Sequence, residues 1–433
     1  KVSIKGKTTG NMTYNKFLEN VKETCLKAFK NQEYPFDELV ELVDGKRDAS
    51  RHPIFDVMIN LCNNDCKNAD LKGMEIEWMV EKDENVGLDL SFDIVKYDDE
   101  FEIQLRYCTE LFKKENVEMI LKHFVTVLQE ITKKPSMKID EIVVVNEEEK
   151  RILMDFNTTN VEYPKDKTIV ELFEEKVKST PNRKAVVFEG QELTFVQLNE
   201  KANQLARKLR EAGVKPNDYV GMITERSIEM VIGVFGILKA GGAYVPIDPT
   251  FSNERIRFML TDCSPKAVLV YKTDINDDIL TDIRVFDLEK ADLFDGDVSN
   301  VNTVNCVDDK VYCIYTSGTT GTPKGVEIGN VGIVGLIKSY ETVFRMNEDD
   351  RMLQYANYCF DQSVADIFGT ILNGATLYVV STELRYDIEA LEDYICDNEI
   401  TVISLTPKII REMYPAKLKK VRVVDSGGEE GEL

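Results

Sequence analysis

The 433-residue sequence is poor in histidine, in tryptophan and in long apolar runs. It holds two histidines and one tryptophan. No run of about 18 apolar residues is present, and the opening Lys-Val-Ser-Ile-Lys lacks an apolar signal segment, so no membrane contact is predicted. Cys62 and Cys66 are the one close cysteine pair, and with so few histidines the sequence predicts no metal site. His52 and His123 are interpreted as surface or satisfied, partly buried side chains.

Positive charge is also scarce. Lysine and arginine number 54 against 77 aspartate and glutamate, which gives a net charge of -23. This excess repels phosphodiester backbones and argues against nucleic acid as a main partner. The nine cysteines are an odd number scattered through apolar stretches, typical of reduced core thiols in a cytoplasmic protein. The length predicts about three domains of about 150 residues each.

Periodicity in the first third of the chain predicts a mixed unit. Apolar residues recur at helical spacing over 17–29 and over 117–131, while alternation over 88–94 and 101–107 predicts an antiparallel hairpin. Residues 1–134 are therefore expected to form an α+β unit. Prolines, an acidic run and a polar stretch mark 135–167 as an inter-domain connector.

Strands and helices alternate through the remaining residues, 168–433. Helices are predicted over 198–209 and 228–239, and short apolar strands over 219–223, 243–247, 267–271, 311–315, 376–380, 401–405 and 421–424. Such alternation favours an α/β fold with a mainly parallel sheet covered by helices on both faces. Ligands bind such sheets at the carboxyl ends of the strands.

A glycine- and hydroxyl-rich loop follows the strand predicted over 311–315. It reads Tyr315-Thr-Ser-Gly-Thr-Thr-Gly-Thr-Pro-Lys-Gly-Val326. Glycines let backbone amides approach an anion, hydroxyls donate to phosphate oxygens, and Lys324 supplies a positive charge. Pro323 stands where a Walker A loop has the glycine before its lysine, so a different nucleotide-using chemistry is indicated. The alternative is a solvated linker, which would not need a lysine behind a proline.

The order of motifs resembles a nonribosomal peptide synthetase over essentially the whole chain. Leu193-Thr-Phe-Val-Gln-Leu198, Leu238-Lys-Ala-Gly-Gly-Ala-Tyr-Val-Pro-Ile-Asp248, the loop 315–326 and Phe360-Asp-Gln-Ser363 are similar to the first four core motifs of an amino-acid adenylation domain. Tyr34-Pro-Phe-Asp-Glu-Leu-Val40 and Arg47-Asp-Ala-Ser-Arg-His-Pro-Ile-Phe-Asp56 resemble the carboxyl-terminal lobe of a condensation domain.

This resemblance implies an architecture. Residues 1–134 would be an incomplete condensation half-domain, a chloramphenicol acetyltransferase-like α+β lobe. Residues 135–167 would be the connector, and residues 168–433 the amino-terminal core of an adenylation domain of the adenylate-forming superfamily, without its carboxyl-terminal lid. In the first segment, Arg47, Asp48 and Arg51 are interpreted as salt-bridge and turn-capping residues and not as catalytic groups.

The resemblance also implies a reaction, in which an amino acid and Mg-ATP give an aminoacyl adenylate for loading on a phosphopantetheine-bearing carrier domain. The residues implied to bind the ATP phosphates are Thr316, Ser317, Gly318, Thr319, Thr320, Gly321 and Lys324. Those implied to face adenine are Gly427, Gly428 and Glu429, for which a plain turn at a strand end is an equal alternative.

Asp361 is implied to pair with the α-ammonium group of the substrate. Judged by the residues alone, a helix N-cap role would be preferred for it. The other positions implied to line the amino-acid pocket are Gln362, Ala365, Ser404, Val424 and Ser426. This mixture does not identify the amino acid, because one methylene contributes only about 1–3 kcal/mol of discrimination.

The sequence departs from the family pattern in several places. Asn330 stands where a histidine is usual. The motif for the Mg²⁺ glutamate, the ribose-binding aspartate, the lid with its catalytic lysine, the His-His-x-x-x-Asp-Gly motif and a carrier serine are not found. The chain alone is therefore expected to turn over little or not at all. Two alternatives stay open: an acyl or aryl carboxylate–CoA ligase-like enzyme, and an inert structural fragment.

Overall fold

A computed structural model describes residues 9–42, 54–63, 88–96, 100–273, 275, 277–316 and 323–430. The chain divides into two compact units, Lys1–Asn160 and Val161–Leu433. In the part of the chain that is described, no helix is long and apolar enough to cross a membrane.

The first unit combines helices with a small sheet, as the periodicity predicts. Its elements are α1 (Tyr14–Lys30), α2 (Phe36–Leu42), β1 (Val57–Asn63), β2 (Leu90–Lys96), β3 (Phe101–Tyr107), α3 (Lys114–Lys133) and α4 (Glu147–Phe156). Strand β2 pairs parallel with β1 and antiparallel with β3, which confirms the predicted hairpin. The rings of Phe92 on β2 and Phe124 on α3 lie 5.1 Å apart, so the apolar face of α3 packs under the sheet.

Helix α4 begins at a capping box. The side chain of Asn146 accepts from the amide of Glu149, and the Glu149 carboxylate accepts from the amide of Asn146. The other oxygen of the Glu149 carboxylate lies 2.6 Å from Nε2 of His123 on α3. His123 therefore has a structural hydrogen-bond partner. His52, Arg47, Asp48, Arg51 and Cys66 lie outside the described residues.

The second unit alternates strands and helices along its whole length. Its elements are α5 (Ile169–Ser179), β4 (Lys184–Phe188), β5 (Gln191–Thr194), α6 (Phe195–Glu211), β6 (Tyr219–Thr224), α7 (Ile228–Ala240), β7 (Ala243–Ile247), α8 (Asn253–Cys263), β8 (Ala267–Tyr271), β9 (Arg284–Asp287), β10 (Lys310–Thr316), β11 (Lys324–Gly329), α9 (Asn330–Val343), β12 (Arg351–Gln354), α10 (Asp361–Ile371), β13 (Thr376–Val379), α11 (Ile388–Asp397), β14 (Val402–Leu405), α12 (Pro407–Glu412) and β15 (Val423–Ser426).

These strands form two six-stranded sheets. Their orders are β11-β10-β7-β6-β8-β9 and β15-β14-β12-β13-β4-β5. Only the terminal pairs β10–β11 and β4–β5 are antiparallel within these two sheets. The parallel arrangement agrees with the fold class expected from the sequence, and the strands are shared between two sheets. Strand β11 also takes up the last residues of the predicted loop, because Val326 and Ile328 pair along β10.

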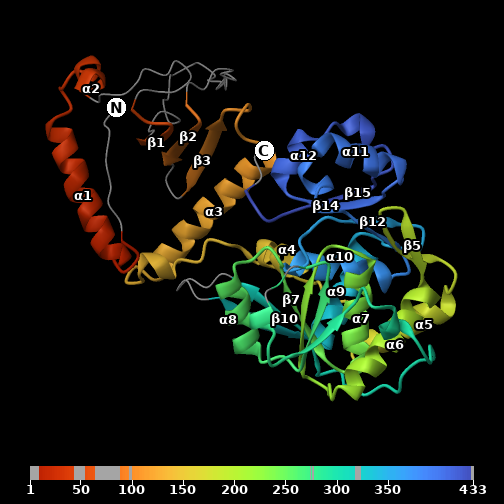
Figure 1. The fold of residues 1–433 in the computed structure, drawn as a ribbon. Coiled ribbons are helices and arrows are strands. Elements are labelled where there is room, and N and C mark those ends of the chain that lie inside the picture. Colours follow the sequence, from red (N-terminus) through yellow and green to blue (C-terminus); the bar gives the residue numbers. More distant parts are fainter. Residues whose placement is uncertain are drawn as a thin grey trace, which may run out of the picture. The chain divides into compact units, whose positions relative to one another are not determined.

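Helices lie between the two sheets and on the outer face of each (Figure 1). Helix α8 covers the first sheet, and α11 covers the second, each over its own apolar cluster. The inner layer holds α7, in which all residues but one are buried, as expected of a helix packed on every side.

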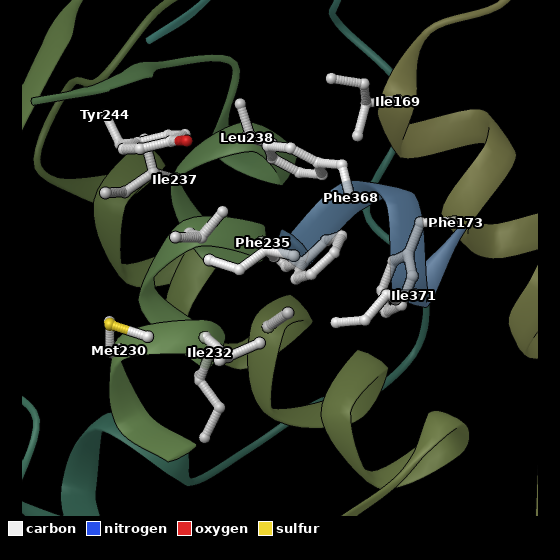
Figure 2. Packing of buried hydrophobic residues seen from close by; sticks show 14 of the residues in the cluster. Ile169, Phe173, Met230, Ile232, Phe235, Ile237, Leu238, Tyr244, Phe368 and Ile371 are labelled. Atoms are coloured by element: carbon white, nitrogen blue, oxygen red, sulfur yellow. The ribbon is translucent and has the colours of Figure 1, made fainter. Parts of the chain in front are cut away.

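The inner layer is held by stacked aromatic rings (Figure 2). Phe235 on α7 stacks on Phe173 of α5 with ring centroids 4.2 Å apart, and it meets Phe368 of α10 edge-on at 5.8 Å. All three side chains are fully buried. Helix α10, which begins with Asp361, is thus fixed to the core through its carboxyl-terminal half.

Candidate functional site

The ends of the predicted phosphate-binding loop are joined as a β-hairpin. Thr316, the last residue of β10, is the register partner of Lys324, the first residue of β11. Both side chains are exposed, and Lys324 has no ion-pair partner among the described residues. Ser317, Gly318, Thr319, Thr320 and Gly321 lie outside the described residues.

Close packing of β11 against β10 requires a glycine, Gly325, directly after Lys324. A Cβ at this position would lie 2.7 Å from Sγ of Cys313 on β10, closer than real Cβ atoms come. Glycine therefore lets β11 approach β10 at this point. The backbone that carries Lys324 is held in register by this close contact, while its ammonium group stays accessible.

The segment before α10 is anchored to the carboxyl edge of the first sheet. The buried hydroxyl of Tyr358 donates to the carbonyl of Ile247 at 2.5 Å and accepts from the amide of Thr224 at 3.1 Å. Asn357 donates from Nδ2 to Asp248 at 2.5 Å. These contacts with β6 and with the end of β7 hold the amino terminus of α10 at the edge where open α/β sheets bind ligands.

Asp361 is the first residue of α10, and Phe360 is the N-cap. The N-cap role that the residues alone favoured is therefore not the one adopted. The Asp361 side chain is exposed and has no hydrogen bond or ion pair among the described residues. It lies near Tyr312 of β10, whose pKa is raised first by burial and further by the Asp361 charge.

Gln362 and Asp366 lie one helical turn apart on α10 and are hydrogen-bonded. Nε2 of Gln362 donates to Oδ1 of Asp366 at 3.0 Å and lies 3.5 Å from the hydroxyl of Tyr340 on α9. Ala365 is buried beside them. Burial raises the pKa of Asp366 to about 8, and the nearby charge of Asp425 adds to the rise against the opposing effects of Gln362 and Arg226.

The remaining predicted pocket residues divide between two faces of the strand pair β14–β15. Ser404 is the register partner of Asp425, and its hydroxyl donates to Oδ2 of Asp425 at 2.9 Å. Val424 and Ser426, the neighbours of Asp425 along β15, are exposed on the opposite face because side chains alternate along a strand. The structure thus brings Ser404 together with Asp425, and places Val424 and Ser426 apart from it.

The segment predicted to face adenine forms a turn after β15. Gly428 has φ of +91°, which favours glycine, and a Cβ at Gly427 would meet no atom within 4 Å. The Glu429 carboxylate accepts from the amide of Lys408 at 2.8 Å, in the first turn of α12. This hydrogen bond, with a second from Thr406, lowers the pKa of Glu429. The Glu429 side chain therefore caps a helix, while the glycines leave open space beside the turn.

Asn330 is a buried structural residue at the start of α9. Its Oδ1 accepts from the amide of Ile169 at 3.0 Å, and its Nδ2 donates to the carbonyls of Asp309 at 2.9 Å and Cys306 at 3.3 Å. The side chain joins the first turn of α5 to the residues before β10. The departure from the expected histidine is thus accommodated by a satisfied amide.

A polar cavity of about 410 Å³ lies at the strand ends of the two sheets, beside Asn357 and Tyr358, and none of the predicted site residues lines it. Arg226 lines it and is almost fully buried. Its guanidinium donates to the carbonyls of Gln354, Ala356 and Val380 and to Oε1 of Gln354. Burial lowers the Arg226 pKa to about 9, and the charge of Arg385 adds to this effect. Arg226 therefore joins the end of β6 to the ends of β12 and β13.

Three polar residues beside the predicted pocket were missed by sequence reasoning: Tyr340, Asp366 and Asp425. Asp366 carried a detectable signal, because it is an acid inside the apolar run 364–371 of a helix. Tyr340 and Asp425 carried none, since their proximity depends on packing between distant segments. In the described part of the chain, no group of three or more histidine, cysteine, aspartate or glutamate side chains could hold a metal ion.

Two family models match the chain, and together they span most of it. Residues 173–431 match the AMP-binding enzyme family, and residues 2–154 match the condensation domain.

Among curated proteins, the chain is 40% identical to gramicidin S synthase 2 of Brevibacillus brevis over 99% of its length, which is 10% of that protein. It is 40% identical to tyrocidine synthase 3 of Brevibacillus parabrevis over 96% of its length, or 6% of that protein. It is 38% identical to bacitracin synthase 3 of Bacillus licheniformis over 99% of its length, or 7% of that protein. The chain thus spans about a tenth or less of these relatives.

Solved structures show the same fold. A holo four-domain nonribosomal peptide synthetase bound to AMP and glycine matches with a TM-score of 0.82 at 22% identity, over 98% of this chain and 33% of that one. The N-terminal subdomain of NpsA from Klebsiella oxytoca, in complex with anthranilyl-AMSN, matches with a TM-score of 0.55 at 25% identity, over 62% of this chain and 69% of that one.

Proposed function

The chain belongs to the AMP-binding enzyme family and is a nonribosomal peptide synthetase fragment that joins part of a condensation domain to an adenylation domain, and from this we propose that its second unit activates an amino acid with ATP. The observation that carries the proposal is the pairing of an accessible Lys324 with Thr316 at the loop end of the β10–β11 hairpin. The matched region also contains Asp361, which has no partner among the described residues.

The two charges suit two parts of such a reaction. Lys324 and the hydroxyl of Thr316 would bind ATP phosphate oxygens and stabilise the charge that develops on them. Asp361 would hold the α-ammonium group and so orient the amino-acid carboxylate. A carboxylate oxygen then attacks the α-phosphorus, the bond from that phosphorus to the bridging oxygen breaks, and pyrophosphate leaves with the electron pair. The product is an aminoacyl adenylate.

The open turn at Gly427 and Gly428, directly after β15, leaves room for a flat base. This space supports the proposal that a nucleotide binds beside the end of β15. Magnesium would arrive as the counter-ion of ATP. The described residues contain no acidic or histidine cluster that fits a bound metal ion, so no step is assigned to it.

We propose 1–134 as the condensation lobe, 135–167 as the connector and 168–433 as the adenylation core. Carrier domains with phosphopantetheine would receive the aminoacyl group.

Asp361 argues against the alternative of an acyl or aryl carboxylate–CoA ligase-like activity. A substrate without an amine would leave this carboxylate unpaired, and replacing it would then change little. With an amino acid, Asp361→Ala should weaken substrate binding, because the ion pair in a site of intermediate dielectric contributes about 4 kcal/mol before desolvation is subtracted. An Asp361→Ala variant that activates amino acids as well as the wild type would refute the assigned role.

The proposal is tested by ATP–pyrophosphate exchange, with the chain assayed inside the complete synthetase module. Lys324→Ala should lower exchange by about 100-fold or more, since it removes a donor to the transition state. The control is Lys419→Ala, which removes an exposed lysine of the same unit and should leave exchange unchanged. Equal exchange by the wild type and Lys324→Ala would contradict the role of this hairpin.

A further inference from the structure

The hydroxyl of Tyr315 joins the β10–β11 hairpin to a helix on the outer face of the first sheet. Tyr315 is the penultimate residue of β10, and it is 7% exposed. Its hydroxyl donates to Oδ2 of Asp262 on α8 at 2.5 Å. Burial, and then this hydrogen bond, raise the pKa of Tyr315, so the hydroxyl keeps its proton and is the donor. A short hydrogen bond to a carboxylate belongs to the stronger class of hydrogen bonds.

The ring of Tyr315 contacts both α8 and the backbone of β11. Tyr315 and Gly325 are register partners, and a Cβ built on Gly325 would lie 3.4 Å from Cζ of Tyr315. The ring therefore lies against the backbone directly after Lys324. The ring of Phe258 on α8 meets it edge-on, with ring centroids 6.4 Å apart. Tyr315 thus connects the strand that carries Lys324 to α8.

Asp262 occupies an unfavourable position for an acid. It lies in the last turn of α8, which ends at Cys263 and has no basic residue in that turn. The carboxyl end of a helix carries partial negative charge, so a carboxylate is disfavoured there. Helix stability does not explain an aspartate at this exposed position, whereas the hydrogen bond to Tyr315 gives it a role.

This hydrogen bond lies next to the two residues proposed to bind ATP phosphates. Tyr315 directly precedes Thr316, and its register partner Gly325 directly follows Lys324. Thr316 and Lys324 are themselves exposed, so their neighbours in the two strands determine how firmly the hairpin is held. A shift of the hairpin against the sheet would displace the Lys324 ammonium group, and small displacements of binding groups can lower a rate strongly.

We propose that Tyr315 and Asp262 are positioning residues for the adenylation reaction. Their hydrogen bond fixes the loop end of the β10–β11 hairpin against α8 and so holds Lys324 where the ATP phosphates bind. This inference rests on the proposed function, and it adds two residues that act through the same site without contacting the substrate.

Tyr315→Phe tests the proposal through ATP–pyrophosphate exchange in the complete synthetase module. The variant removes only the hydroxyl and keeps the ring that packs against Gly325. It should raise KM for ATP and lower kcat, so that kcat/KM for ATP falls by about tenfold or more, while KM for the amino acid stays unchanged. A loss of folded protein would lower the apparent kcat alone. Wild-type KM for ATP in Tyr315→Phe would therefore overturn the inference and leave the proposed function intact, whereas no exchange by the wild type would overturn both.

Variants of Asp262 test the partner. Asp262→Ala should match Tyr315→Phe, and Asp262→Asn, which keeps an oxygen acceptor, should retain most of the exchange. The double variant Tyr315→Phe/Asp262→Ala should lose no more than either single variant, because both remove the same hydrogen bond. Additive losses would refute the pairing. Since Asp262 is exposed, its variants decide the question should Tyr315→Phe fail to fold.

Tyr219→Phe is a matched control on the same hairpin. The Tyr219 hydroxyl donates to the carboxylate of Glu327, which lies on β11 two residues further from the loop than Gly325. Tyr219→Phe should keep the wild-type KM for ATP. An equal rise in KM for ATP in this control would show that any weakening of the hairpin has the same effect, and would overturn the assignment to Tyr315 and Asp262.

Discussion

The buried carboxyl of Asp366 should make the second unit less stable as the pH rises. Burial raises its pKa from 3.8 to about 8, so between these values the folded chain holds a proton that the unfolded chain has lost. The free energy of unfolding then falls by about 1.4 kcal/mol for each pH unit in this window. At pH 7, about three units above the pKa of Asp366 in the unfolded chain, the free energy of unfolding is lower by about 4 kcal/mol.

Asp366→Asn should remove this dependence. Asparagine is uncharged and keeps an oxygen to accept from Gln362, but its amide nitrogen would occupy the place of the unpartnered Oδ2. An unsatisfied buried donor costs about 1–3 kcal/mol. The penalty in the wild type reaches about 5 kcal/mol at pH 8. The variant should therefore exceed the wild type at pH 8 by roughly 2–4 kcal/mol and lose this advantage near pH 5, where aspartic acid is protonated.

Urea denaturation of the full chain, followed by circular dichroism at pH 5, 7 and 8, measures this difference. Subtracting the variant from the wild type cancels the titration of groups that both proteins share. The difference should change by about 4 kcal/mol from pH 5 to pH 8, and the exposed control Asp397→Asn should show no such change. A difference that stays constant over this range would show that Asp366 is not held neutral by burial.

Two further substitutions test the packing around the site. Asn330→Ala should lower the free energy of unfolding by about 2–4 kcal/mol, because it leaves the amide of Ile169 and the carbonyl of Asp309 without their buried partner; an unchanged thermal midpoint would contradict this role. Gly369→Ala would bring a Cβ to 2.4 Å from the ring of Tyr340, and should destabilise by about 1–3 kcal/mol. That loss should shrink when measured in a Tyr340→Ala background, and equal losses in the two backgrounds would argue against the contact.

Local patterns were sufficient for most helices and strands, because periodicity and end signals are properties of neighbouring residues. The apolar run 228–239 predicts α7, and the alternation over 101–107 predicts β3. The division of the strands between two sheets could not be predicted in this way. It depends on which distant segments pair, such as β4 with β13, and no local pattern encodes that partner.

The candidate site shows the same boundary between local and distant information. The loop motif was visible as a sequence, and the structure places its flanking residues Thr316 and Lys324 opposite each other. The sequence did not show which side chains of β15 lie on the same face of the sheet as Ser404. With a side-chain period of two, the register Ser404 to Asp425 decides which residues of β15 accompany Ser404, and a shift of one residue would exchange them. The family resemblance indicated which positions could line the pocket. The pairing of β14 with β15 determined the face on which each side chain lies.

The hydrogen bonds of the Arg226 guanidinium limit how the sequence of the second unit can vary. Three of the four acceptors are peptide carbonyls, which every amino acid offers equally. These hydrogen bonds therefore constrain the path of the backbone after β12 and β13. They do not constrain the identity of the side chains there, apart from Gln354. Recombination that imports foreign sequence around the proposed amino-acid pocket can preserve the junction between the sheets, provided that the incoming segment keeps the same backbone course and a glutamine at that single position.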